Sequence, residues 1–156
     1  MKNDTSSQDV RQRVGQQLSF ALYAAHSRIV RLHRSFLEPL GLTYPQFLVV
    51  VCLYESMPRT VGDIGSALGM DTGTLTPLLK RLVSAGLVTR ERDTQDERRV
   101  LIGLAPATEA IREEVLGIPA KIETACRLSN EDLANLRDTL NGLAHSPPSK
   151  RDGEED

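Results

Sequence analysis

Tryptophan is absent from this chain of 156 residues, and the aromatic residues together make up only 4% of it. Sandwiches and barrels usually draw on aromatic and β-branched side chains to fill their cores. Leucine, valine and alanine dominate the apolar residues instead, which favours packed helices. A chain of this length can bury the core of one domain of ordinary size.

Long apolar runs are missing as well. No stretch approaches the roughly 20 apolar residues that a membrane-spanning helix needs. The first nine residues, MKNDTSSQD, lack the hydrophobic region of a signal peptide. We therefore expect a cytoplasmic protein that has no membrane partner.

Cysteine is scarce, with only Cys52 and Cys126. Two cysteines form neither a disulfide framework nor a cluster of metal ligands, so we expect no metal and no cofactor. Cys52 stands in an apolar run and is expected to be an inert core residue.

An excess of positive charge is also missing, since the formal net charge is −2. Any binding to DNA must therefore rest on local charge. The charged run at 150–156 contributes much of the acidity and is typical of a solvated tail. We expect residues 1–13 and 147–156 to be disordered.

Helical periodicity is the main structural signal in the first third of the chain. Apolar residues recur at helical spacing from Val14 to Leu40, which predicts one long helix that Gly41 ends. A helix this long is expected to pack partly against a second subunit. Thr43 as N-cap and Pro45 in the first turn predict a second helix, which is apolar all round and hence buried.

Two short helices joined by a turn follow. Residues 61–68 form the first helix, the turn is Gly69-Met70-Asp71, and the second helix runs to about Ser84. Thr72 or Thr74 is expected to cap this second helix, and Gly86 to close it. Together they predict a helix-turn-helix. The expected buried stripe of its second helix is Leu75, Leu78, Leu79 and Leu82.

A β-hairpin is predicted next, with strands at 87–92 and 99–104 and a polar tip at 93–98. The fold class is therefore mainly α with a small β-hairpin wing, a winged helix-turn-helix with a helical dimerisation domain.

Two further helices complete the chain. One is expected from Pro106 to about Leu116, with a kink or restart near Pro119. The last helix is expected to be capped by the run 129–132 and to end at Pro147-Pro148.

The second helix of the pair and the hairpin carry the candidate DNA-binding residues. Hydroxyls and backbone N–H groups at a helix N-terminus suit phosphate oxygens and base edges. Taken alone, this helix fits equally well an ordinary surface helix whose threonines only cap it. The arginines of the hairpin that follows decide in favour of DNA binding. The candidates are Asp71, Thr72, Thr74, Thr76, Lys80, Arg81, Arg90, Arg92, Asp96 and Arg98.

Arg98 is the sharpest single candidate. An arginine at a wing tip can enter a narrow minor groove, where negative potential is focused. Asp96 is expected to hold its guanidinium through a bidentate pair. The competing interpretation is a solvated charged turn, which is the commonest meaning of such a run.

The segments 18–25, 42–47, 71–82 and 96–98 resemble the MarR family of transcriptional regulators, in its OhrR-like branch that responds to organic hydroperoxides. The resemblance runs from about Leu18 to Leu143. It implies no enzyme but a homodimeric repressor of the oxidative-stress type, which binds a pseudo-palindromic operator in double-stranded DNA. It divides one domain, 14–146, into dimerisation helices at 14–42 and 105–146 and a winged helix-turn-helix at 43–104.

The sensor of that branch is altered here. Its members carry a reactive cysteine in the first helix, hydrogen-bonded by tyrosines of the partner, and Ser19 stands at the matching position. His33 replaces one tyrosine, Tyr44 is retained, and Tyr23 lies one turn from Ser19. A serine hydroxyl neither ionises near neutral pH nor forms a sulfenic acid, so Ser19 should keep the protein in its reduced-like, DNA-binding form.

Several alternatives stay open. Ser19 is either a deliberate replacement of cysteine or a natural divergence that lost thiol sensing, and His33, a second change in the same pocket, favours divergence. The effector is then a peroxide or a small molecule in a pocket at the dimer interface. The pocket candidates are Ser19, Tyr23, His33, Tyr44 and Cys126.

Two other classes of protein compete with the regulator. A thiol peroxidase or small hydrolase would use Ser19 or Cys126, but Ser19 lacks the Gly-x-Ser-x-Gly elbow and a recognisable acid–base partner. Cys126 lies near the resolving cysteine of some relatives, yet packing at a surface or interface is the favoured role. A helical interaction module without DNA binding is disfavoured by the basic residues of the hairpin.

Overall fold

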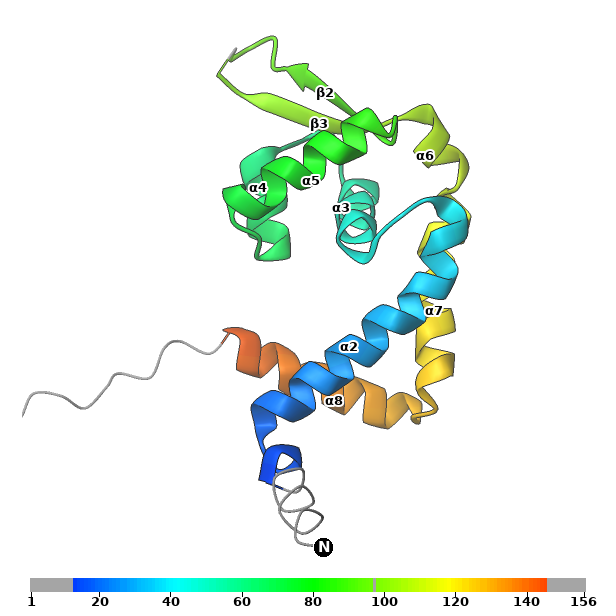
Figure 1. Ribbon diagram of the computed structural model, residues 1–156. Coiled ribbons are helices and arrows are strands. Elements are labelled where there is room, and N and C mark those ends of the chain that lie inside the picture. Colours follow the sequence, from blue (N-terminus) through cyan, green and yellow to red (C-terminus); the bar gives the residue numbers. More distant parts are fainter. Residues whose placement is uncertain (1–12, 97, 146–156) are drawn as a thin grey trace, which may run out of the picture. The chain divides into compact units, whose positions relative to one another are not determined.

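The computed structural model describes residues 13–96 and 98–145 (Figure 1). The ends that we expect to be disordered lie outside the described residues, apart from Arg13, and so does Glu97 in the hairpin tip. The chain divides into two compact units, Met1–Ile122 and Glu123–Asp156. The predicted division of residues 14–146 into dimerisation and DNA-binding parts stays a prediction.

The first unit contains a winged helix-turn-helix. Its elements are α3 (Tyr44–Glu55), β1 (Arg59–Thr60), α4 (Val61–Leu68), α5 (Thr72–Ser84), β2 (Val88–Arg92) and β3 (Val100–Leu104). The strands form an antiparallel sheet in the order β1-β3-β2, in which Arg90 lies opposite Ile102. The predicted fold class, mainly α with a small hairpin wing, is confirmed. Strand β1 was not predicted because two residues show no alternation.

The long first helix is shorter than its apolar pattern predicted. Helix α2 spans Leu18–Leu37 and continues as the 3-10 turn η1 (Glu38–Leu40). Gln17 has extended backbone angles (φ −80°, ψ 129°), so the helix cannot run back to Val14. Gly41 ends it at φ 68°, as predicted, in a conformation that costs glycine little.

The recognition-type helix α5 has the predicted length but a different cap. Asp71, and not Thr72 or Thr74, is its N-cap, because Asp71 Oδ1 accepts the Thr74 N–H at 2.7 Å. A carboxylate one position before the helix competes well with a threonine for this role. Gly86, at φ 69°, closes the helix as predicted.

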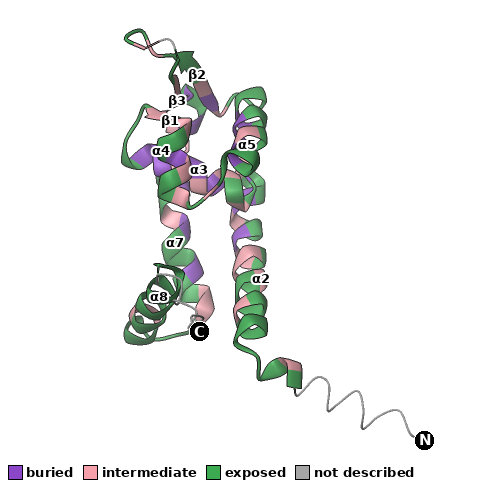
Figure 2. Ribbon diagram, turned by 90° about the vertical axis from the view of Figure 1, so that its left-hand side faces the viewer, coloured by how far each residue is buried: buried purple, intermediate pink, exposed green. Residues whose placement is uncertain are grey.

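Apolar side chains of α3, α4, α5 and the sheet form the core of this unit (Figure 2). All four leucines of the predicted α5 stripe are buried, with Leu82 fully covered. Ile64 of α4 and Ile102 of β3 are also fully buried. Helix α3 contributes six buried residues: Phe47, Val49, Val50, Cys52, Leu53 and Tyr54.

The segment after the wing departs from the prediction. Helix α6 (Pro106–Ala110) ends at Ile111, and α7 (Arg112–Cys126) runs through Pro119 without interruption. The break lies at Ile111 because its N–H bonds back only three residues, to Thr108 O. The expectation of a helix to Leu116 with a restart at Pro119 was therefore wrong.

The second unit contains α8 (Asn130–His145). Ser129 Oγ accepts the Asp132 N–H at 3.1 Å, which confirms the predicted cap. Leu136, Leu140 and Leu143 are 48%, 38% and 51% exposed, so this helix leaves an apolar stripe uncovered within the described chain.

Neither a metal site nor a simple membrane span is found among the described residues. Residues 13–96 and 98–145 hold no group of three or more His, Cys, Asp or Glu suited to a metal ion. No single helix there is long and apolar enough to cross a membrane. The segments Leu18–Leu40 and Tyr44–Glu55 meet the length and composition criteria only as a pair bent by 72°.

Buried polar groups fasten the root of the wing to α3. The Tyr54 hydroxyl donates to the carbonyl of Thr108, and Thr108 Oγ1 donates to the carbonyl of Leu87 at 2.6 Å. Arg112 Nη2 donates to Tyr54 O at 3.0 Å, and its guanidinium lies 4.8 Å from the centre of the Tyr54 ring. Burial, with Glu109 nearby, raises the pKa of Tyr54, and Arg112 opposes this shift.

Replacing Tyr54 by phenylalanine should lower the free energy of unfolding by about 1 kcal/mol at neutral pH, because the buried Thr108 carbonyl loses one of its two donors and keeps only the Ile111 N–H. The raised pKa means that Tyr54 stabilises the fold below about pH 10 and that this contribution is lost as the pH rises above 10. Urea unfolding at neutral and alkaline pH measures both effects. Two results would contradict this role of the Tyr54 hydroxyl. One is equal free energies of unfolding for the unaltered protein and Tyr54→Phe at neutral pH, and the other is the same loss of stability above pH 10 in both proteins.

Candidate nucleic-acid interface

Helix α5 presents a polar face opposite its leucine stripe. Thr72, Thr74, Lys80 and Arg81 are exposed, and Thr76 is half-buried. Leucines at helical spacing fix this orientation, because they turn one side of α5 into the core and the other side away from it. Five of the predicted DNA-binding residues therefore share one helix whose rotation the core determines.

Asp71 stands at the N-terminus of that face. Its Oδ1 accepts the Thr74 N–H at 2.7 Å and its Oδ2 accepts the Thr74 hydroxyl at 3.2 Å. The backbone bond from Thr74, and next the hydroxyl bond, lower the pKa of Asp71, so that it stays a carboxylate at neutral pH. Both oxygens of this predicted DNA-binding residue are therefore engaged within the protein.

The wing carries the predicted arginines on its surface. Arg90 and Arg92 on β2 are exposed, and the Arg98 side chain is 93% exposed. Figure 1 shows the β2–β3 hairpin extending away from α4 and α5. An arginine exposed to this extent can reach a partner surface.

The contact between Asp96 and Arg98 is weaker than predicted. Arg98 Nε lies 3.3 Å from Asp96 Oδ1, and the Arg98 N–H donates to the same oxygen at 3.1 Å. Asp96 accepts through one oxygen only, so the expected bidentate pair was wrong. The two residues are too close in sequence for the fork to face the carboxylate squarely.

One ion pair at the wing was not predicted. Arg99 Nη1 lies 3.6 Å from Asp93 Oδ2, and the Asp93 side chain is only 15% exposed. This pair spans the hairpin end and leaves Arg98, not Arg99, as the arginine that projects. Sequence offered a signal, since Asp93 and Arg99 bracket the tip.

Two hollows bring candidate residues of different elements together. Thr76 and Lys80 of α5 line a small hollow with Arg90 of β2. Arg98 and Arg99 line an open hollow of about 500 Å³ whose other wall is Thr60–Asp63, the start of α4. Strand register and the leucine stripe thus place α5, β2 and the wing along neighbouring surfaces.

The N-terminus of α4 has its own cap, which the prediction missed. Asp63 N–H donates to Thr60 Oγ1 at 3.1 Å, and the Thr60 hydroxyl donates to Asp63 Oδ2 at 2.7 Å. The bond from the Thr60 hydroxyl, and next a bond from the Thr60 backbone N–H at 3.2 Å, lower the pKa of Asp63. The signal was present as a threonine followed three residues later by an acidic residue.

The predicted sensor residues do not all meet within one chain, although His33 and Tyr44 do. Ser19 and Tyr23 are exposed near the start of α2, whereas His33 is 7% exposed near its end. Fourteen residues of helix separate Ser19 from His33 by about 21 Å along the axis. A pocket that holds both side chains therefore needs a second subunit.

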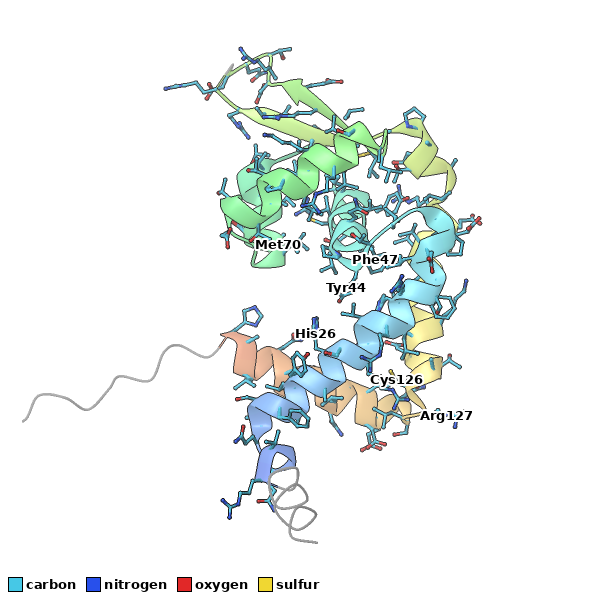
Figure 3. The ribbon with its side chains drawn as sticks, viewed as in Figure 1. His26, Tyr44, Phe47, Met70, Cys126 and Arg127 are labelled. Atoms are coloured by element: carbon cyan, nitrogen blue, oxygen red, sulfur yellow. The ribbon has the colours of Figure 1, made fainter. Side chains whose placement is uncertain are left out.

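His33 packs into an aromatic cluster with α3. Its ring centre lies 4.6 Å from that of Tyr44 and 5.5 Å from that of Phe47, and Nδ1 is 2.9 Å from Ile29 O. Tyr44 and Phe47 lie side by side on α3 (Figure 3). Burial raises the pKa of Tyr44. His26, seven residues before His33 on α2, is exposed.

A groove beside this cluster is open to solvent. It encloses about 570 Å³ and is lined by Arg31 and Arg34 of α2 together with Tyr44 and Pro45 of α3. Arginines beside an apolar wall suit an anionic group on a small molecule, although Glu38 also lines the groove and offsets part of their charge. Among the five predicted sensor residues, Tyr44 alone lines this groove.

The two cysteines differ in environment. Cys52 is buried in α3, and its pKa is raised by burial and by Glu55, against the opposite effect of Arg59. A protonated core thiol is unreactive, as predicted. Cys126 is half-buried and belongs to the second unit, whereas Ser19 belongs to the first.

Comparison with known proteins agrees with this geometry. The MarR family model matches residues 42–100, from just before α3 to the first residue of β3. The organic hydroperoxide resistance transcriptional regulator of Bacillus subtilis is 40% identical over 124 residues, which cover 80% of this chain and 84% of the relative. The regulator MgrA of Staphylococcus aureus is 36% identical over 132 residues, which cover 84% of this chain and 90% of MgrA.

A solved structure of reduced AbfR bound to DNA is 30% identical, with a TM-score of 0.70 over 90% of this chain and 98% of AbfR. These relatives are transcriptional regulators and not enzymes, which confirms that expectation. The identity over most of both chains, the matching winged helix and the polar face of α5 lead to one conclusion. The chain belongs to the MarR family of transcriptional regulators.

Proposed function

We propose that this protein is a homodimeric repressor that places α5 in the major groove of an operator and the wing in the adjacent minor groove. The observation that carries the proposal is the polar face of α5, held outward by four buried leucines next to exposed wing arginines. Recognition helices of this kind read base edges, while flanking cations bind phosphates. AbfR, a relative of similar fold, is bound to DNA in its solved structure.

Charge is concentrated where this proposal needs it. The chain has a net charge of −2, yet α5 and the hairpin carry Lys80, Arg81, Arg90, Arg92 and Arg98 on exposed positions. Phosphate contacts from such residues release counterions, so affinity should fall steeply with salt. Action on chromosomal DNA would place the protein in the cytoplasm.

A dimer is favoured by apolar side chains that the described chain leaves uncovered. Leu18, Phe20 and Tyr23 of α2 are 64%, 42% and 68% exposed. Contiguous exposed apolar side chains commonly mark an interface. A second copy would cover them and bring Ser19 of one subunit within reach of the other, and a two-fold symmetric dimer fits a pseudo-palindromic operator.

The effector is proposed to be a small molecule, with a peroxide as the less favoured alternative. Ser19 lacks the thiol that peroxide sensing requires, and Cys52 is buried. The groove beside Tyr44 encloses about 570 Å³ and is lined by two arginines against one carboxylate, Glu38. An acidic ligand that binds there, where α2 meets α3, would act on the helix from which the winged unit starts.

Arg98→Ala should weaken binding to the operator by about 1–3 kcal/mol, because the wing loses its projecting cation. Fluorescence anisotropy with a labelled operator duplex, recorded over a salt series, measures the loss of affinity. It also measures the slope of log affinity against log salt concentration, whose magnitude should fall by about one. Arg98→Lys keeps the charge and should lose less. An affinity unchanged in Arg98→Ala would remove the proposed role of the wing tip.

Cumene hydroperoxide should leave the protein–operator complex intact, since Ser19 cannot be oxidised as a thiol. Anisotropy before and after treatment tests this, and Ser19→Cys is the matched variant in which release is expected. Release from the unaltered protein that disappears in Cys126→Ala but persists in Cys52→Ala would show that Cys126 is a sensor and contradict the prediction.

A further inference from the structure

Asp71 and Thr74 form a closed pair of hydrogen bonds at the start of α5. One carboxylate oxygen accepts the Thr74 N–H at 2.7 Å, and the other accepts the Thr74 hydroxyl at 3.2 Å. The first bond caps the helix. The second does not contribute to the cap, because it joins two side chains, and it fixes both the rotamer of Thr74 and the direction of its hydroxyl proton.

Gly73 leaves room for this pair. A Cβ at position 73 would lie 3.1 Å from Asp71 Oδ1, closer than ordinary van der Waals contact. Any larger side chain at position 73 would press on the carboxylate that holds Thr74. The sequence Asp71-Thr72-Gly73-Thr74 thus contains both residues of the hydrogen-bonded pair, and Gly73, which has no side chain to displace the Asp71 carboxylate.

The direction of the hydroxyl proton decides what Thr74 can bind. A free threonine hydroxyl both donates and accepts. The Thr74 hydroxyl donates its proton in a hydrogen bond to the Asp71 carboxylate. The exposed side of the hydroxyl therefore offers only oxygen lone pairs, beside the methyl group of Thr74. Thr72 is the contrasting case, since its hydroxyl has no partner within residues 13–96 and 98–145.

We propose that Asp71 is a positioning residue that makes Thr74 an obligate hydrogen-bond acceptor in the major groove. The inference rests on the proposed DNA-binding function. In the major groove adenine and cytosine expose an amino donor, whereas guanine exposes two acceptors. Thr74 therefore selects adenine or cytosine at one position of each half-site and rejects guanine there.

A role in positioning also explains why an acid belongs on a DNA-binding face. A free carboxylate beside phosphates would be repelled. A carboxylate that accepts two hydrogen bonds within the protein strengthens those bonds through its negative charge. Asp71 thus resembles Asp96, which contacts Arg98, in that it would act through a neighbouring side chain and not by contact with a base or phosphate.

The test is selection of preferred sites from a pool of duplexes with a randomised segment, followed by sequencing of the bound DNA. For the unaltered protein we expect one position per half-site at which guanine is depleted about five- to tenfold against adenine or cytosine. Asp71→Ser keeps an N-cap acceptor for the Thr74 N–H but has a single oxygen, so the Thr74 hydroxyl becomes free to donate.

Asp71→Ser should restore guanine at that position alone, with an unchanged unfolding midpoint. Thr74→Val, which keeps the shape and methyl group but has no acceptor, should lose the preference for amino-bearing bases at the same position. Ser129→Thr alters the cap of α8, outside the winged helix-turn-helix, and should change no base preference. It is the matched control.

Three outcomes overturn the inference. The first is a motif that neither Asp71→Ser nor Thr74→Val changes, and the second is loss of preference at all positions equally, as a purely structural role predicts. The third is guanine favoured at the affected position in the unaltered protein. If the unaltered protein enriches no sequence at all, the proposed DNA-binding function fails together with the inference. The three outcomes above overturn the inference but leave the proposed DNA-binding function standing, so the two kinds of failure can be told apart.

Discussion

Burial of the leucine stripe on α5 is the constraint on which the rest of the winged unit depends. Leu75, Leu78, Leu79 and Leu82 are all buried against the α3 core, and a fully buried leucine contributes about 1.5–3 kcal/mol. Rotation of α5 by even one residue would expose some of them. The same packing therefore stabilises the fold and aims the polar face, so that core and recognition surface cannot vary independently.

Sequence periodicity was sufficient for the elements that pack through repeated apolar positions. Helices α4 and α5, the hairpin strands and the glycine ends at Gly41 and Gly86 all lie within a residue or so of prediction. Competition between neighbouring polar residues was harder to resolve. Asp71 outcompeted two threonines for the α5 cap, and the helix break fell at Ile111, although Pro119 carries the stronger local signal.

The candidate site shows the same division. Which residues of α5 and the wing are exposed could be predicted, because the leucine stripe sets the outer face of α5 and the hairpin positions concerned are charged. Strand alternation was no guide, since Arg90, Glu91 and Arg92 are all exposed. Which charged side chains of the wing pair with one another could not be predicted, because these contacts depend on side-chain rotamers. Asp93 pairs with Arg99, and Asp96 contacts Arg98 through one oxygen. The sensor residues stand apart for another reason. Ser19 and His33 lie on the same helix yet far from one another, so a single chain cannot define their pocket.

The buried bonds at the root of the wing have a mechanical consequence. The Leu87 carbonyl accepts both the Ala105 N–H at 3.1 Å and the Thr108 hydroxyl at 2.6 Å, so the two ends of the hairpin are joined where they leave the core. Arg90 and Arg92 lie on the strand next to this joint, which would hold them at a fixed place relative to the core. The tip beyond them has no such bond to the core among the described contacts, and its Arg98 side chain is 93% exposed, so it is there that a contact would adapt to the local width of a groove. Spacing along the operator would thus be set by a stiff frame, and tolerance for DNA shape by a few residues at its end.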